Sequence, residues 1–282
     1  MKTLSDTRMP ELLDIYKTSY LKMSDGVELR LLSYIPENPK AVIFLNPGLG
    51  TLLLSWEKLL DYLWKENYEV YYFESREKYT ARYPGKTIIT KDRMIQDVVE
   101  AIEQLELKDY IAIGSSLGST ILIHAMARKQ IHPTHAILVG PNAEMKLPFG
   151  FKIILPLVND FIYKLTKPIV KWYILNKYTD KQTDPEQYYK YSLGIDLSVP
   201  SRFRKVIQAW IGNKVWDDLP LIESHCVLVG AEKDKLHASD LTRKIAEMIP
   251  NADYVDLGTN KAAHDKPLLK LIEKILKGEP LS

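Results

Sequence analysis

The stretch YIAIGSSLGSTIL, residues 110–122, contains the local patterns that decide the fold of this chain. Its first part is a short apolar run, typical of a strand that is buried on both faces. Its second part, continued by IHAMARK, has the apolar content of a buried helix. Two adjacent serines, Ser115 and Ser116, lie between them, with Gly114 and Gly118 on either side. The stretch therefore predicts a strand, a sharp turn and a helix in direct succession.

Similar apolar runs recur along the chain and alternate with helical patterns. Strands are expected over residues 27–35, 41–46, 68–75, 110–115, 135–140, 225–230 and 253–258. Apolar residues repeated at i, i+3, i+4 and i+7 predict helices over residues 53–67, 91–107, 241–249 and 266–278. Because strands that alternate with helices form parallel sheets, the sequence predicts an α/β fold with a mostly parallel central sheet flanked by helices.

One long segment interrupts the alternation. Residues 142–216 are mainly helical in pattern and crowded with aromatic side chains, and they are too long for an ordinary connection. We interpret them as a helical cap, or lid, inserted before the last strands, with residues 1–141 and 217–282 as the core. The alternative is a set of additional core helices without a functional role.

Composition excludes several other classes of protein. The chain has 282 residues, is 46% hydrophobic and carries a net charge of +2, too little to indicate binding of nucleic acid. The single cysteine, Cys226, excludes an internal disulfide and lies in an apolar run, which predicts a buried, inert thiol. We find no signal peptide, no apolar stretch long enough to span a membrane and no metal-ligand cluster, so a cytoplasmic protein without metal or cofactor is expected.

The glycine spacing selects one of the two serines as a candidate nucleophile. In the pattern G-x-S-x-G the reactive serine is the third residue, which is Ser116 in GSSLG. A serine at a sharp turn from strand to helix is held in a strained conformation with its hydroxyl exposed, and side chains two residues away on either side would collide with the crossing elements. Ser115 is then the small residue that lets the turn close. The alternative is a plain polar turn.

A serine hydroxyl needs a base, and the base needs an acid to orient it. His264 lies in a loop after the last predicted strand, where it can be directed across the edge of the sheet. Asp234 lies in the loop after the preceding strand and is the predicted acid, with Glu232 as its rival. The order along the chain, nucleophile then acid then histidine, is that of a known triad scaffold.

A glycine turn provides a candidate oxyanion site. The segment FLNPGLGT, residues 44–51, follows a strand and precedes a helix, and backbone N–H groups in such a turn can point at one spot. If the N–H of Leu49 faces that of Leu117, the pair would stabilise a tetrahedral oxyanion. The alternative is an ordinary glycine turn.

These motifs together resemble those of the α/β-hydrolases. The resemblance rests on NPGLG, GSSLG, GAEKD and AAHDKP in the expected order, and it covers residues 27–141 and 217–282 as core and 142–216 as cap. It implies a largely eight-stranded sheet, with Ser116 as nucleophile, Asp234 as acid, His264 as base and the backbone N–H groups of Leu49 and Leu117 as oxyanion donors. Pro47-Gly48 replaces the His-Gly of many members. ESREKYTARYPG stands where lysophospholipase-like and monoglyceride-lipase-like members carry Asp-x-Arg-Gly-His-Gly.

The sequence thus predicts a serine hydrolase that cleaves carboxylic esters through an acyl-enzyme. The apolar cap favours an ester with a hydrophobic acyl or alcohol part. Acyl transfer, thioester cleavage and peptide cleavage by the same triad stay open, as does a non-catalytic hydrolase-fold protein that binds a ligand or partner. Transient contact of the cap with a membrane surface is a further alternative, because lysines alternate with apolar residues over 151–175.

Overall fold

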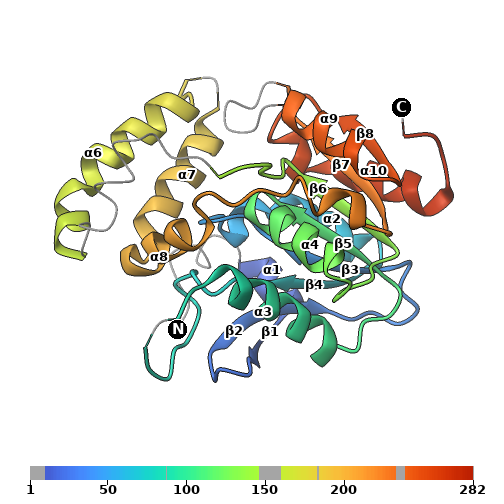
Figure 1. The fold of residues 1–282 in the computed structure, drawn as a ribbon, viewed down its shortest axis with the longest axis horizontal. Coiled ribbons are helices and arrows are strands. Elements are labelled where there is room, and N and C mark those ends of the chain that lie inside the picture. Colours follow the sequence, from blue (N-terminus) through green and yellow to red (C-terminus); the bar gives the residue numbers. More distant parts are fainter. Residues whose placement is uncertain (1–9, 87, 146–159, 183, 233–238, 282) are drawn as a thin grey trace.

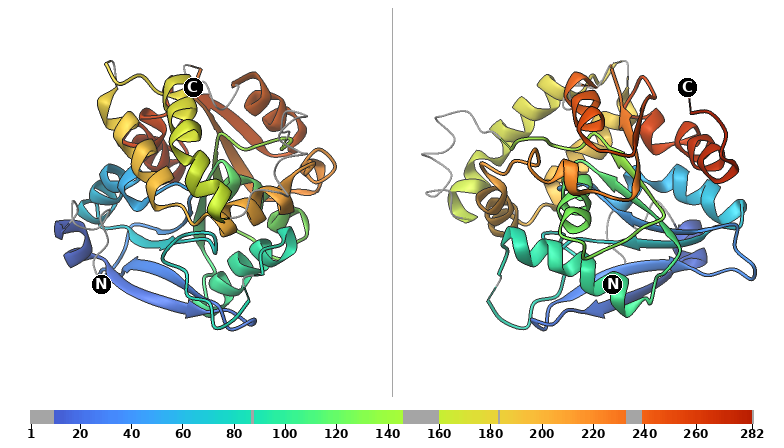
Figure 2. Two further views of the ribbon diagram at one scale, coloured as in Figure 1. Left: turned by 90° about the vertical axis from the view of Figure 1, so that its left-hand side faces the viewer. Right: turned by 45° about the vertical axis from the view of Figure 1, so that its right-hand side comes forward.

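The structure, a computed structural model, places an eight-stranded sheet at the centre of the molecule (Figures 1 and 2). It describes residues 10–86, 88–145, 160–182, 184–232 and 239–281. The strands are β1 (Lys17–Lys22), β2 (Glu28–Tyr34), β3 (Val42–Asn46), β4 (Glu69–Phe73), β5 (Tyr110–Ser115), β6 (His135–Val139), β7 (His225–Gly230) and β8 (Ala252–Asp256). Their order across the sheet is β1-β2-β4-β3-β5-β6-β7-β8, and every neighbouring pair from β4 onward is parallel.

The predicted α/β fold is confirmed. Each expected strand is present, with its bounds shifted by one or two residues at most. The sequence pattern missed β1, which pairs antiparallel with β2 at the edge of the sheet. The short helix α1 (Pro10–Ile15), which precedes β1, was also missed.

The faces of the sheet are covered by α1 together with α2 (Glu57–Lys65), α3 (Lys91–Gln104), α4 (Leu117–Ala127), α9 (Ser239–Met248) and α10 (Lys266–Lys277). A second group of helices follows β6 and consists of α6 (Asp160–Tyr178), α7 (Pro185–Leu197) and α8 (Pro200–Trp210). The predicted helix over 53–67 is divided into a 3₁₀ turn, Leu53–Ser55, and α2, with Trp56 between them. The predicted helices over 91–107, 241–249 and 266–278 are present as α3, α9 and α10.

The strands supply side chains to two hydrophobic cores, one on each face. In β3, Ile43 and Leu45 belong to the core that α1, α2 and α10 cover, whereas Phe44 belongs to the core that α3, α4 and α9 cover. In β5, Ile111 and Ala112 divide between the two cores in the same way. Because both faces are buried, the parallel strands are apolar at consecutive positions, which explains the continuous apolar runs in the sequence.

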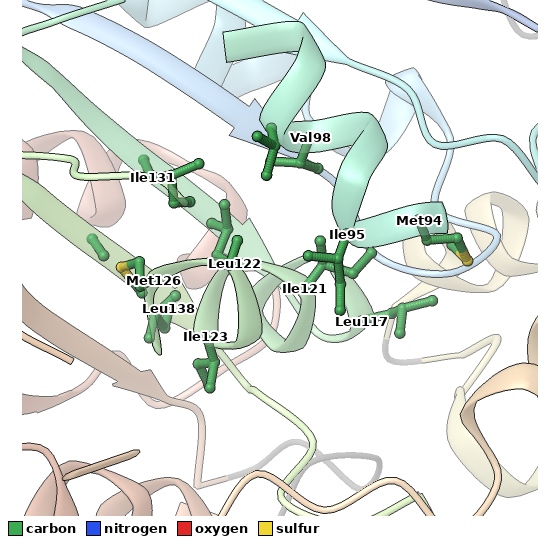
Figure 3. Packing of buried hydrophobic residues seen from close by; sticks show 14 of the residues in the cluster. Met94, Ile95, Val98, Leu117, Ile121, Leu122, Ile123, Met126, Ile131 and Leu138 are labelled. Atoms are coloured by element: carbon green, nitrogen blue, oxygen red, sulfur yellow. The ribbon is translucent and has the colours of Figure 1, made fainter. Parts of the chain in front are cut away.

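Helix α4, which follows Ser116, lies in the interior of the molecule. All of its residues are buried. Figure 3 shows Ile121 and Leu122 on the side of α4 that faces Ile95 and Val98 of α3. A helix surrounded by protein in this way gives Ser116 a rigid support at its N-terminus.

Helices α6, α7 and α8 come from the segment predicted as a cap, and they lie together at one side of the molecule (Figure 1). Helix α8 also contacts the core, since Trp210 Nε1 donates a hydrogen bond to Met94 Sδ of α3 at 3.2 Å. The division into core and cap remains a prediction.

Helix α6 exposes three large apolar side chains, Leu165, Ile169 and Trp172. The contact of this segment with a membrane surface remains a prediction.

Two observations bear on the expected class of protein. Among the residues that the structure describes, no helix combines the length and hydrophobicity needed to cross a membrane. Within the same ranges, no cluster of three or more His, Cys, Asp or Glu side chains could hold a metal ion. Cys226 is buried as predicted, and burial raises the pKa of its thiol to about 12, which keeps it protonated and inert.

A buried ion pair in the loop after β4 gives a testable stability difference. Arg76 is fully buried and donates from Nε and Nη2 to Asp97 at 2.5 Å, and from Nη1 to Asp25 at 2.9 Å. Arg76→Met would leave the buried Asp97 carboxylate with Arg93, 3.1 Å away, as its cationic partner and without the two short bonds from Arg76. We therefore expect a loss of about 3 kcal/mol in the free energy of unfolding, at the lower end of the range for a broken buried ion pair. Urea unfolding measures it.

The matched control is the exposed pair of Arg82 and Glu28, whose charged atoms are 3.3 Å apart. Arg82→Met should cost less than about 1 kcal/mol, because exposed ion pairs contribute little. Equal losses in the two variants would contradict the special role of the buried pair.

Candidate active site

Ser116 has the strained backbone that its motif predicts. Its φ is 50° and its ψ is −114°, a conformation that residues other than glycine rarely adopt, and α4 begins at the next residue. A Cβ on Gly114 would lie 2.6 Å from Ser119 Cα, and one on Gly118 would lie 2.0 Å from Asn46 O. Both glycines are thus required by the close crossing of α4 with the ends of β3 and β5.

The carboxyl ends of the parallel strands bring the candidate residues to one cavity of about 410 Å³. Leu49 follows β3, Ser116 follows β5, Asn142 follows β6 and His264 follows β8. One wall of the cavity comes from α6, α7 and α8, through Val170, Ile174, Lys190, Tyr191, Gly194, Ile195 and Phe203. The volume and the mostly apolar lining are those of a small-molecule site.

Asn142 contacts the hydroxyl of Ser116. Its Nδ2 donates a hydrogen bond to Ser116 Oγ at 3.2 Å, and its backbone N–H donates to Thr120 Oγ1 at 3.2 Å. The first bond uses a lone pair of the Ser116 oxygen and does not involve the hydroxyl hydrogen. Sequence reasoning missed Asn142, although a polar residue in the short turn after a buried strand at this edge was a signal for it.

His264 lies in the 3₁₀ turn Ala262–His264, after β8. Its Nδ1 is 2.8 Å from the backbone O of Asn260. A carbonyl can only accept, so we assign the proton to Nδ1, which leaves Nε2 as an acceptor in the neutral ring. Nε2 lies 3.5 Å from Ser115 Oγ, and the indole of Trp56 packs on the imidazole with ring centres 4.3 Å apart. Asn260 and Trp56 were not predicted.

The predicted acid, Asp234, lies outside the described residues, as does His237. Its rival Glu232 is exposed, and the Glu232 backbone N–H donates to Asp256 Oδ1 at 3.3 Å. The choice of acid therefore remains a prediction. In the described part of the molecule, the Asn260 carbonyl already fixes the tautomer of His264.

The two predicted oxyanion donors lie on either side of Ser116. Leu117 is the first residue of α4, so its N–H has no acceptor within the helix. Leu49 lines the cavity, and the preceding Gly48 is so close that a Cβ on it would lie 3.2 Å from Ser116 Cβ. The role of the two N–H groups remains a prediction.

Three of the four other histidines that the structure describes contact specific side chains, and the fourth, His132, is exposed. His124 is buried in α4 and contacts Asp218 through Nδ1 and Asn213 Oδ1 through Nε2, the latter at 3.0 Å. His225 Nε2 lies 2.9 Å from Asp253 Oδ2. The ring of His135 packs edge-on against that of His225 with centres 5.3 Å apart. These contacts agree with the choice of His264 as the candidate base.

Charged residues lie beside His264 at the edge of the cavity. Lys190 Nζ is 2.8 Å from Glu186 Oε1, and Lys58 Nζ is 3.2 Å from Glu186 Oε2. Hydrogen bonding by Lys190, helped by Lys58, lowers the pKa of Glu186 to about 2, so this carboxylate stays ionised. The Lys58–Glu186 ion pair joins α2 to α7 next to the candidate site.

The fold and this arrangement of loops define an α/β-hydrolase. The chain belongs to the family described as serine aminopeptidase, S33, whose model matches residues 37–265. A comparison with curated proteins finds no match.

Solved structures of similar fold include hydrolases and esterases. A hydrolase from Pseudomonas aeruginosa superposes with a TM-score of 0.78 at 17% identity, over 93% of this chain and 98% of that one. An esterase from Thermogutta terrifontis superposes with a TM-score of 0.75 at 14% identity, over 93% of this chain and 98% of that one. An esterase from Exiguobacterium antarcticum superposes with a TM-score of 0.73 at 16% identity, over 93% of this chain and 97% of that one. At these identities the likeness establishes the fold, which is that of esterase- and lipase-type hydrolases.

Proposed function

We propose that this protein is a serine hydrolase that cleaves carboxylic esters with a hydrophobic acyl or alcohol part. The observation that carries the proposal is the strained Ser116, which shares a mostly apolar cavity with His264. Strain at a non-glycine residue persists only where the surrounding structure holds it, and it gathers at functional sites.

The chemistry uses the chain's own groups. Ser116 Oγ attacks the ester carbonyl carbon while His264 Nε2 takes the hydroxyl proton, and the carbonyl oxygen becomes an oxyanion between the N–H groups of Leu49 and Leu117. The C–O bond to the alcohol then breaks, and His264 gives its proton to that alcohol. A water activated by His264 hydrolyses the acyl-enzyme and restores Ser116. Asp234 is the proposed acid that stabilises the imidazolium.

Aminopeptidase activity, which the family description names, is the second candidate. An aminopeptidase binds the ammonium group of its substrate, and a carboxylate suits that task. Among the described residues that line the cavity, Lys190 carries a cationic side chain and no carboxylate is present, while the Glu186 carboxylate at the cavity edge is already paired with Lys190 and Lys58. The lining therefore favours an ester with apolar substituents over a peptide amino terminus.

A fluorophosphonate probe tests the nucleophile. We expect wild type and Ser115→Ala to be labelled and Ser116→Ala not to be labelled, because the probe reacts with an activated serine. Intact-protein mass spectrometry of the folded variants measures the adduct. Absence of label on folded wild type would contradict the proposed function, and label that persists in Ser116→Ala but is lost in Ser115→Ala would move the nucleophile to the neighbouring serine.

The same preparations test the substrate class. With p-nitrophenyl esters, kcat/KM should rise as the acyl chain lengthens beyond acetate, because a longer chain buries more apolar surface in the cavity. Leucine p-nitroanilide should be a much poorer substrate than the esters. A preference for the anilide would replace ester hydrolysis by aminopeptidase activity.

A further inference from the structure

The loop after β4 places a buried lysine behind the proposed oxyanion site. Lys78 and the neighbouring Glu77 are both 4% exposed. The Lys78 ammonium donates a hydrogen bond to Gly48 O at 2.7 Å and lies 2.9 Å from Glu77 Oε1. The mechanism described above does not use either charged group, so their burial needs another explanation.

The acceptor of this hydrogen bond belongs to the same peptide unit as a proposed oxyanion donor. Gly48 C=O and Leu49 N–H form one planar trans peptide, so the two groups point in opposite directions. The Gly48 oxygen also accepts from the Thr51 N–H at 3.1 Å, which gives it two donors. Fixing the carbonyl from one side therefore fixes the direction of the Leu49 N–H on the other side, where Leu49 lines the cavity with Ser116.

We propose that Lys78 is a positioning residue for ester hydrolysis: its ammonium orients and polarises the Gly48–Leu49 peptide so that the Leu49 N–H stabilises the oxyanion. The inference rests on the proposed function. A charge-assisted hydrogen bond is roughly twice as strong as a neutral one, and a bond to the carbonyl makes the N–H of the same peptide a better donor. Lys78 touches neither the substrate nor Ser116 in this role.

The buried charges of Lys78 and Glu77 neutralise each other. Burial alone would raise the pKa of Glu77, but the charge of the Lys78 ammonium, 2.9 Å from Oε1, lowers it below its usual value, so the carboxylate is ionised at neutral pH. Buried ion pairs add little to stability compared with apolar residues of similar volume. Stability alone is therefore a weak reason for placing this pair behind a glycine turn.

The loop that carries Lys78 is also held from the side of α8. Arg202 Nη1 donates to the Lys78 backbone O at 2.6 Å, and its guanidinium packs over the ring of Tyr83 at 4.5 Å from the ring centre. Lys78 is thereby restrained at both its backbone and its ammonium group. A restrained donor can hold the Gly48 carbonyl without reorganisation during the reaction.

The competing explanation is that Lys78 only neutralises Glu77, and a matched pair of variants separates the two. Glu77→Gln removes the partner charge and keeps the donor to Gly48 O. The double variant Glu77→Gln/Lys78→Met removes both charges, so it leaves no buried carboxylate without a partner. The comparison of the double variant with Glu77→Gln therefore isolates the contact with Gly48.

We expect kcat for a p-nitrophenyl ester to fall about 10- to 100-fold from Glu77→Gln to the double variant, with KM changed less than about twofold, since removing an oxyanion donor altogether costs ~10²–10³-fold. A trifluoromethyl ketone, which Ser116 converts to a tetrahedral oxyanion, should lose affinity by the same factor as kcat. Glu77→Gln/Lys78→Arg, which restores a charged donor, should recover part of both losses.

Several results would overturn the proposal. These are equal kcat in Glu77→Gln and the double variant, a loss confined to KM, or a fall in kcat without weaker binding of the trifluoromethyl ketone. Failure of the proposed function would give a different result: wild type would neither hydrolyse the ester nor react with a fluorophosphonate. If wild type is active and the variants have the same kcat, only the proposed role of Lys78 is contradicted.

Discussion

His264→Gln is expected to lower kcat for ester hydrolysis by roughly 10⁴- to 10⁶-fold, the range for loss of the base from a serine triad. Glutamine fills much of the same space but cannot take the proton of Ser116. The imidazole is prepared for that task, because its Nδ1 hydrogen is donated to Asn260 O at 2.8 Å and Nε2 remains an acceptor. Stopped assays with a long-chain p-nitrophenyl ester measure the loss.

The matched control is His225→Gln. His225 pairs with Asp253 at the amino end of β7, away from the cavity, and its replacement should leave kcat within about twofold because it touches no reacting group. Circular dichroism and thermal unfolding verify that both variants are folded. A kcat of His264→Gln within tenfold of wild type would remove this histidine from the mechanism.

The sequence predicted the strands well wherever both faces of the sheet are covered. Consecutive apolar residues in β3, β5 and β7 reflect burial against helices on either side, so their runs are easily recognised. Strand β1 has no such run, because it lies at the sheet edge and its side chains range from half-buried to exposed. Its polar sequence, KTSYLK, is accordingly hard to distinguish from a loop.

The candidate site divides in the same way between local and long-range information. The strained turn at Ser116 was predictable because its signal, two glycines around a serine, lies within five consecutive residues, even though the collision that requires Gly118 is with Asn46 of the distant β3. Asn142, Asn260 and Lys78 were not, because each acts through a contact with a residue far along the chain or through its backbone carbonyl. A local sequence pattern does not indicate that the Lys78 ammonium hydrogen-bonds to the carbonyl of Gly48.

Gly118→Ala should lower activity about 10²-fold or more even though alanine is the better helix residue. In an ordinary helix the change would gain about 1 kcal/mol. Here the new Cβ would lie 2.0 Å from Asn46 O, a backbone atom at the end of β3 that cannot rotate away. Separating the two requires the start of α4 to move by more than about 1 Å, and such a displacement of a catalytic group costs about 10²-fold or more in rate. We therefore expect a loss of roughly 3 kcal/mol in unfolding free energy, together with a fall of about 10²-fold or more in the rate of fluorophosphonate labelling.

Gly85→Ala supplies the matched control, since a Cβ at that position would meet nothing within 4 Å. The same substitution there should leave labelling unchanged and alter stability by less than about 1 kcal/mol, through the unfolded chain alone. Urea unfolding and labelling rates of both variants distinguish the effect of the collision with Asn46 from the general effect of replacing glycine by alanine. If Gly118→Ala were as stable and as reactive as Gly85→Ala, the close crossing of α4 and β3 would not be what holds Ser116 in its strained conformation. The glycine spacing that singled out this serine would then lose its physical explanation.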